Sequence, residues 1–160
     1  MTERRHELLI LGIGNLLLGD EGVGVHAVQQ LERMELPPEI ACMDGGTGGF
    51  HLLEAMQQAE RLVIIDAAAA DDAPGSIARL RPRYASDYPP TLTAHDIGLK
   101  DLLSAFHLLG DNPDVRLIAI TIDPHQDLGM ELSPVIQQAA EQAVAMVLEE
   151  VDEFCGKQFA

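Results

Sequence analysis

An apolar run that stops abruptly at glycine places the strongest constraint on how this chain folds. Residues 8–14 contain that run and its glycines, and the acidic pair Asp20 and Glu21 follows. A short apolar run bounded by glycine is typical of a buried strand, and the glycines indicate a tight turn. Apolar residues then recur at helical spacing over 25–34. The pattern predicts a strand, a loop and a helix, with the carboxylate of Glu21 at the start of the helix. The partial positive charge at a helix N-terminus favours the ionised form of such a carboxylate.

A glycine turn of this kind resembles nucleotide-binding loops, but two requirements fail. A dinucleotide fingerprint needs a glycine three residues after Gly14, where Leu17 stands, and we expect Leu17 to block close packing of helix on strand. A P-loop needs Gly-Lys-Ser/Thr, and this loop contains no lysine. Asp20 and Glu21 would also repel a phosphate. Nucleotide binding is therefore disfavoured. Taken alone, the stretch is better explained as a turn whose glycines set the backbone geometry, with solvated acids near a helix start.

Composition and charge narrow the class of protein. We expect the 160 residues to form one domain over 1–160. No apolar run reaches the roughly 18 residues that cross a bilayer, and the N-terminus contains no apolar signal region, so we expect a cytoplasmic location. Cys42 and Cys155 form no CxxC pair and are expected to be free thiols. The net charge of −16 disfavours nucleic acid and anionic membranes as partners and suits a metal ion or a basic protein segment.

Strand and helix patterns alternate along the rest of the chain. Strands are expected at 39–44, 61–66 and 115–122, with a sheet-edge strand at 76–81. Helical spacing is found at 50–56, at 97–106 and from Ser133-Pro134 towards Glu150, after which the tail from Asp152 is expected to fray. The segment 84–93 is predicted to be a surface loop. Such alternation predicts an α/β fold of three layers, α/β/α, around a mostly parallel sheet.

Acidic residues stand where the predicted strands end. Glu21 follows the first strand, Asp44 ends the second, Asp66 ends the third, and His95 lies on a loop that enters a helix. Ligands of such sheets bind beyond the carboxyl ends of the strands, so we expect these side chains to share one edge. Two carboxylates and an imidazole are a credible ligand set for nickel, zinc, iron or manganese.

Each of these residues also has an ordinary structural explanation. Asp66 could cap a helix, Glu21 could be a surface carboxylate, and His95 could be a loop histidine held by its neighbour. Asp44 could be a turn-forming residue. His125 lies on a second predicted loop, where a functional role is a guess. The sequence contains no HExxH, no GxSxG and no cysteine on a glycine turn, so other hydrolytic centres are poorly supported.

Taken together, the motifs resemble those of the hydrogenase maturation proteases. Residues 12–24 are similar to the N-terminal signature of these endopeptidases, which trim the C-terminus of the large subunit of nickel-containing hydrogenases. The resemblance continues in order, from residue 7 to about residue 150, through 44–47, 63–67, 94–96 and the Gly-x-Glu-Leu-Ser-Pro pattern at 129–134. It implies a twisted five-stranded sheet between helices.

The resemblance also implies roles for individual residues. By position, Glu21, Asp66 and His95 correspond to the three metal-binding residues, and Asp44 corresponds to a further functional acid, so all four are candidate catalytic residues. The implied metal is the nickel that the substrate already carries, so the protein alone could be nearly metal-free, and another divalent metal could occupy the site in isolation. The implied partner is the hydrogenase large-subunit precursor, cut after a histidine or arginine, and the protein is expected to be a monomer.

Two mechanisms and one alternative function stay open at this point. The metal could acidify a coordinated water that attacks the peptide carbonyl, as in a metal-dependent endopeptidase. The metal could instead serve only as a recognition mark while a carboxylate such as Asp44 activates water, which is closer to an aspartyl-type endopeptidase. The alternative function is a non-catalytic nickel-checking chaperone that binds the precursor through the same three ligands without shortening it.

Overall fold

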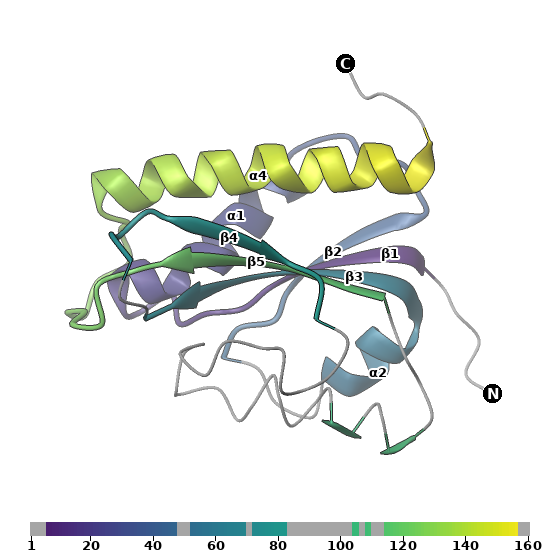
Figure 1. Ribbon diagram of the computed structural model, residues 1–160, viewed down its shortest axis with the longest axis horizontal. Coiled ribbons are helices and arrows are strands. Elements are labelled where there is room, and N and C mark those ends of the chain that lie inside the picture. The colour runs from purple at the N-terminus through teal and green to yellow at the C-terminus, as the bar shows by residue number, and fades with distance from the viewer. Residues whose placement is uncertain are drawn as a thin grey trace.

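The computed structural model is organised around one twisted sheet with helices packed on both of its faces (Figure 1). It describes residues 6–47, 52–69, 72–82, 104–105, 108–109 and 114–156. The loop predicted at 84–93 and most of the helix predicted at 97–106 lie outside these residues. Within them, no helix combines the length and the apolar character needed to cross a membrane.

Five strands pair into one sheet within the described residues, in the order β2-β1-β3-β5-β4. Their bounds are β1 His6–Gly12, β2 Ile40–Asp44, β3 Ala59–Ala68, β4 Ile77–Leu80 and β5 Asp114–Thr121. Four strands run parallel, and β4 lies antiparallel at the edge beside β5. The predicted α/β class, the mostly parallel five-stranded sheet and the edge strand are confirmed.

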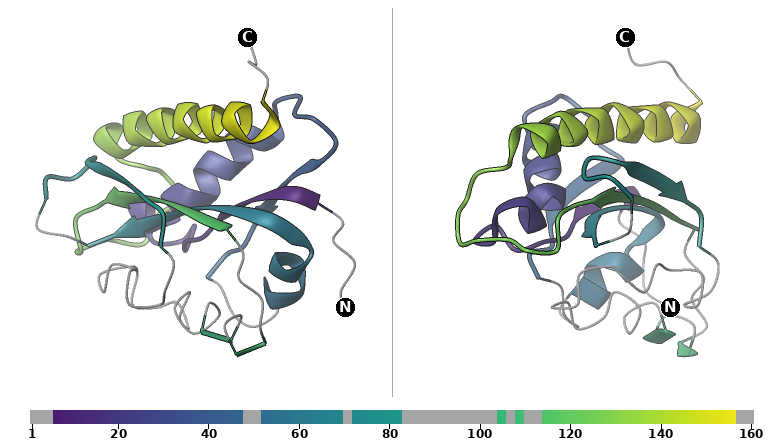
Figure 2. Two further views of the ribbon diagram at one scale, coloured as in Figure 1. Left: turned by 45° about the vertical axis from the view of Figure 1, so that its right-hand side comes forward. Right: turned by 60° about the vertical axis from the view of Figure 1, so that its left-hand side comes forward.

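The helices divide the core into two layers. The described residues contain the short 3-10 helix η1 (Gly19–Gly22) and the helices α1 (Val23–Glu32), α2 (Leu52–Gln57) and α4 (Pro134–Cys155). α1 and α4 cover one face of the sheet and α2 lies on the other (Figures 1 and 2). Side chains alternate between the faces of a strand, so Ile10 of β1 packs with α1 and α4 while Leu11 packs with α2.

The strand order places a topological switch point between β1 and β3. The chain leaves β1 through α1 to reach β2 on one side, and then crosses through α2 to reach β3 on the other side. Loops after such neighbouring strands separate towards opposite faces, and ligands of open α/β sheets bind in the crevice that results. The loop that contains Glu21 follows β1, and Asp66 belongs to β3.

The C-terminal helix continues farther than its pattern indicated. α4 ends at Cys155, where Gly156 adopts a left-handed conformation with φ of 63°. Near this end, the Arg61 guanidinium lies 4.7 Å from the centre of the Phe154 ring. The fraying predicted from Asp152 onward is therefore wrong for the described residues, because the cap and this contact hold the last turn.

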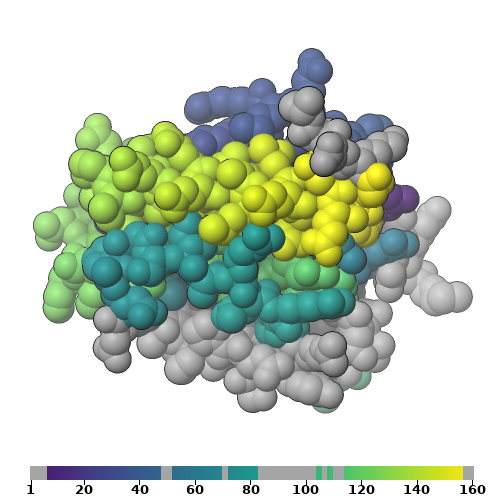
Figure 3. Space-filling model, turned by 45° about the horizontal axis from the view of Figure 1, so that its top comes forward, coloured from purple at the N-terminus to yellow at the C-terminus, as the bar shows by residue number. Residues whose placement is uncertain are grey.

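An ion-pair network joins α4 to the sheet edge. The carboxylate of Glu150 is buried and accepts a hydrogen bond of 2.8 Å from the Arg79 guanidinium of β4. Arg116 of β5 lies 3.6 Å from the same carboxylate. Figure 3 shows α4 lying across one face of the molecule with β4 directly beside it. A buried carboxylate needs such partners, and these fix the register between helix and sheet.

Candidate functional site

The glycines after β1 let the next helix press closely onto the strands. A Cβ atom on Gly12 would strike the carbonyl of Gly24 on α1, and a Cβ on Gly24 would strike the carbonyl of Ile65 on β3. That same Ile65 carbonyl accepts a hydrogen bond of 2.9 Å from the backbone N–H of Ile13. The glycines are therefore needed because the backbone of α1 packs directly against the backbone of β1 and β3, and not because they bind a phosphate.

The predicted obstruction by Leu17 is wrong. The Leu17 side chain is 58% exposed and lies outside the contact between helix and strand. Five residues separate it from the first residue of α1, Val23, because η1 intervenes. The apolar spacing also overestimated the helix at its other end, where α1 stops at Glu32 and leaves Met34 exposed.

Glu21 is buried in η1, immediately before α1. Gly14 has φ of +152°, and a Cβ on it would collide with the Glu21 carbonyl, so this glycine lets η1 lie against the end of β1. η1 also contacts β3. Glu21 is thus placed at the predicted edge of the sheet, one residue before the N-cap Gly22.

Asp66 is fully buried, and it lies inside β3 rather than at its end. The strand continues for two residues beyond Asp66, because 66–68 pair in register with β5. One carboxylate oxygen of Asp66 accepts a hydrogen bond of 2.8 Å from the backbone N–H of Ala67. The prediction that Asp66 ends its strand is therefore wrong by two residues. Since η1 contacts β3, Glu21 and Asp66 belong to two packed segments at the switch point, and we call this pair the carboxylate edge.

Asp44 ends β2, as predicted, opposite Gly12 in the register of β1 and β2. It is exposed, and one of its carboxylate oxygens accepts a hydrogen bond of 2.8 Å from the backbone N–H of Gly46. By strand alternation Asp44 continues the face that carries α1 and α4, whereas Asp66 continues the face that carries α2. The structure therefore does not bring Asp44 and Asp66 together on one face of the sheet.

His95, the third predicted ligand, lies outside the described residues. Among those that are described, no group of three or more histidine, cysteine, aspartate or glutamate side chains is arranged to hold a metal. The structure thus shows the two carboxylates of the predicted set and leaves the imidazole as a prediction. Carboxylate and imidazole donors together suit a divalent transition metal better than a phosphate or a nucleotide.

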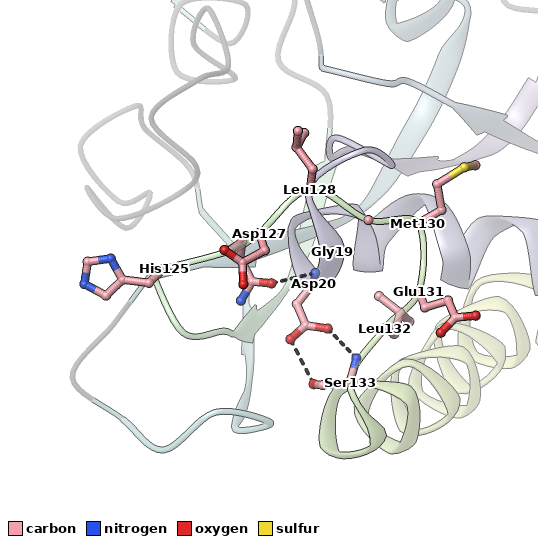
Figure 4. Close-up of a pocket in the computed structure, with 11 residues that line it drawn as sticks. Gly19, Asp20, His125, Asp127, Leu128, Met130, Glu131, Leu132 and Ser133 are labelled. Carbon is pink, nitrogen blue, oxygen red and sulfur yellow. Dashed lines mark hydrogen bonds between the residues drawn. The ribbon is translucent and has the colours of Figure 1, made fainter.

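Asp20, which the sequence analysis did not select, links two distant segments. Its carboxylate accepts hydrogen bonds from the backbone N–H of Ser133 at 2.8 Å and from the Ser133 hydroxyl at 2.9 Å. Its own N–H donates to the Gln126 side-chain carbonyl at 2.9 Å (Figure 4). Ser133 is the N-cap of α4 and Pro134 begins the helix, as predicted, yet the hydroxyl bonds Asp20 instead of its own helix. The two residues belong to motifs that the sequence analysis quoted separately, 12–24 and 129–134, and no local pattern in the sequence pairs them.

A pocket of about 670 Å³ opens beside this link. Its lining comes from Gly19 and Asp20 on η1 and from the loop between β5 and α4, residues 125–133. His125 stands on the pocket wall, is exposed, and points away from Asp20 (Figure 4). Its backbone N–H donates to the Asp123 carboxylate at 2.9 Å. The predicted loop is confirmed, and a functional role for His125 stays a hypothesis.

The thiol of Cys42 is a poor nucleophile in this fold. Burial, and secondly the nearby charge of Glu32, raises the pKa of Cys42 to about 11. A cysteine nucleophile needs the thiolate, so Cys42 is inert at neutral pH. This agrees with the absence of a cysteine on any glycine turn of the sequence.

Fold and site together define a doubly wound α/β protein with a carboxylate edge at its switch point. A protein-family model described as hydrogenase maturation protease matches residues 25–150. The Hydrogenase 2 maturation protease of Escherichia coli K12 is 36% identical over 149 residues, which cover 89% of this chain and 91% of that protein. The HupD hydrogenase expression/formation protein of Thiocapsa roseopersicina is 35% identical over 155 residues, covering 92% and 69% respectively.

Comparison with solved structures gives the same family. The hydrogenase maturating endopeptidase HybD from E. coli superposes with a TM-score of 0.81 at 34% identity, covering 92% of this chain and 93% of that one. The solution structure of an endopeptidase from Escherichia coli gives a TM-score of 0.82 at 33% identity, covering 95% of both chains. The chain belongs to the hydrogenase maturation protease family, a family of peptidases.

Proposed function

We propose that this protein is the endopeptidase that removes a short C-terminal peptide from the precursor of a nickel-containing hydrogenase large subunit, after nickel insertion. The proposal is supported by family membership and by relatives named as hydrogenase maturation proteases. The observation that carries it is the carboxylate edge, in which the η1 segment with buried Glu21 packs against the strand with buried Asp66.

In this proposal the nickel belongs to the substrate. Glu21, Asp66 and His95 bind the nickel that the precursor presents, and the two buried carboxylates supply the negative charge that attracts it. A precursor without nickel offers these ligands no metal to coordinate, so it binds weakly and stays uncut. Maturation is thereby restricted to precursors whose metal is already in place.

Asp44 is the residue that we assign to the activation of water. A general base must come within hydrogen-bond reach of the water whose proton it removes, and Asp44 is exposed whereas Glu21 and Asp66 are buried. Its position at the end of β2 keeps it at the same edge of the sheet, although on the other face from Asp66. The nickel then acts as a recognition mark, and the carboxylate performs the proton transfer.

The direct test is the mass of the precursor. Purified protein is incubated with each nickel-loaded large-subunit precursor encoded in the same genome, and intact-mass spectrometry follows the precursor. We expect one precursor to lose a C-terminal peptide of defined mass. If that precursor forms a stable complex but keeps its full mass, the peptidase proposal fails and the chaperone alternative replaces it.

A further inference from the structure

Three apolar side chains stand exposed on η1's neighbouring segments, which hydrogen-bond to each other and to Gly19. Leu17, Leu128 and Met130 are 58%, 84% and 61% exposed, respectively. The backbone brings them together, because the Gly129 N–H donates to the Leu17 carbonyl at 2.8 Å and Gly129 stands between the other two residues. Leu128 and Met130 point to the same side of their segment, away from the hydrogen bonds of Asp20 (Figure 4). Exposed apolar side chains that are grouped together, rather than scattered singly, are typical of interaction sites.

The two segments that carry these side chains are acidic. The two segments that form the pocket region, 15–24 and 122–135, contain five acidic residues and no lysine or arginine: Asp20, Glu21, Asp123, Asp127 and Glu131. Three of these are exposed: Asp123, Asp127 and Glu131. A partner that covers this surface must therefore supply positive charge together with apolar side chains, since an acidic partner would be repelled.

The segment that carries these side chains is held rigidly. The Gly19 N–H donates to the Gly129 carbonyl at 2.8 Å, and the Gln126 side-chain amide donates to the Asp123 carbonyl at 2.9 Å. Asp20 ties the same loop to the start of α4 through Ser133. Exposure of Leu128 and Met130 is thus not a consequence of a loose loop. A preorganised surface loses less entropy when a partner binds.

The geometry points to a docking site for the hydrogenase large-subunit precursor on this surface, which we call the rim: Leu17, Leu128, Met130, Asp127 and Glu131. The occupant is a segment of the precursor in which arginine or lysine stands beside apolar side chains. Four of the five rim residues, all but Leu17, line the pocket of about 670 Å³, which has room for such side chains. The inference rests on the proposed function, and η1 makes the rim continuous with Glu21, so a docked segment leads towards the carboxylate edge.

The test separates docking from cleavage. Rim variants are Leu128→Ser with Met130→Ser, and Asp127→Lys with Glu131→Lys. Matched controls elsewhere are Met34→Ser and Glu141→Lys, an apolar and an acidic residue that are also exposed. Each protein is measured for the Kd of its complex with nickel-loaded precursor by calorimetry, and for kcat and KM of cleavage. All substituted side chains are exposed, so melting temperatures are expected to match the unsubstituted protein and confirm folding.

We expect each rim pair to raise Kd and KM by about tenfold or more while kcat stays within about twofold, and the controls to change neither. Added salt should weaken the binding of the unsubstituted protein.

Rim variants with the Kd and KM of the controls would overturn the docking site. An unsubstituted protein that binds through the rim but leaves the precursor uncut would retain the docking site and reject the proposed peptidase. If the rim variants instead abolish a concentration-dependent dimer in light scattering and leave Kd unchanged, the occupant is a second copy of this chain and the inference is wrong.

Discussion

At the residue scale, two adjacent acids have separate tasks. Asp20 uses both carboxylate oxygens to hold Ser133, so it is part of the framework. Glu21, the next residue, is proposed to face the nickel of the substrate. The sequence shows only an acidic pair at a helix entrance, and the hydrogen bonds that distinguish the two acids cross 113 residues. Local patterns contain no information about such a contact.

Conservative substitutions at the three described acids should separate nickel recognition from hydrolysis. Glu21→Gln and Asp66→Asn remove charge but keep shape, and they should weaken the complex with nickel-loaded precursor and lower kcat/KM by about 100-fold or more. Asp44→Asn should leave the complex intact and lower kcat by about 100-fold or more, as expected for loss of a general base. Calorimetry and single-turnover cleavage measure the two effects. Glu32→Gln, an exposed acid on α1, is the control, and an Asp44→Asn enzyme with normal kcat would contradict the assignment.

The Cys42 thiol provides a test by pH. Burial raises the pKa of Cys42 to about 11, so at pH 9 about 1% of Cys42 is thiolate in the folded protein. In the unfolded chain, where the ordinary pKa of about 8.5 applies, most of it is thiolate. Alkylation of the Cys42 peptide by iodoacetamide should therefore be slow at pH 9 and should accelerate as the pH approaches 11, or on unfolding in urea. Mass spectrometry of that peptide gives the rate. Rapid labelling at pH 8 in the folded protein would show that the thiol is not shielded.

At the element scale, close backbone contact explains the glycine-rich stretch. The apolar run, the glycines and the following helix could be recognised from spacing alone, and β1 and α1 confirm them. The length of β3 could not, because the two residues beyond Asp66 become strand only through pairing with β5. The predicted effect of Leu17 failed for a related reason: the pattern did not show the intervening η1.

Gly24 offers a stability test of this contact. Alanine normally stabilises a helix interior by about 1 kcal/mol relative to glycine. At position 24, however, its Cβ would strike the carbonyls of Ile65 and Ile13, so Gly24→Ala should destabilise the protein by about 1–3 kcal/mol or more. Gly129→Ala is the control, since a Cβ there has no neighbour within 4 Å. Urea unfolding measures both, and a Gly24→Ala protein as stable as the unsubstituted one would contradict the close approach.

At the scale of the whole molecule, the strand order converts scattered acids into one edge. Alternating strands and helices were enough to predict a parallel sheet, and the rule that ligands bind beyond the carboxyl ends of the strands was enough to select Glu21, Asp44 and Asp66. Which face of the sheet each acid occupies depends on the strand register. This register places Asp44 and Asp66 on opposite faces of the sheet. The rim could not be predicted from the sequence either, because the exposure of Leu128 and Met130 is known only from the folded structure.

The central claim is that the carboxylate edge admits a precursor only after nickel has been inserted. The most direct measurement is the cleavage rate of one large-subunit precursor prepared with and without nickel, followed by intact-mass spectrometry under otherwise identical conditions. We expect the nickel-loaded precursor to lose its C-terminal peptide at least about 100-fold faster, a difference of about 2.7 kcal/mol in activation free energy. Equal rates of cleavage for the two precursors would contradict the account.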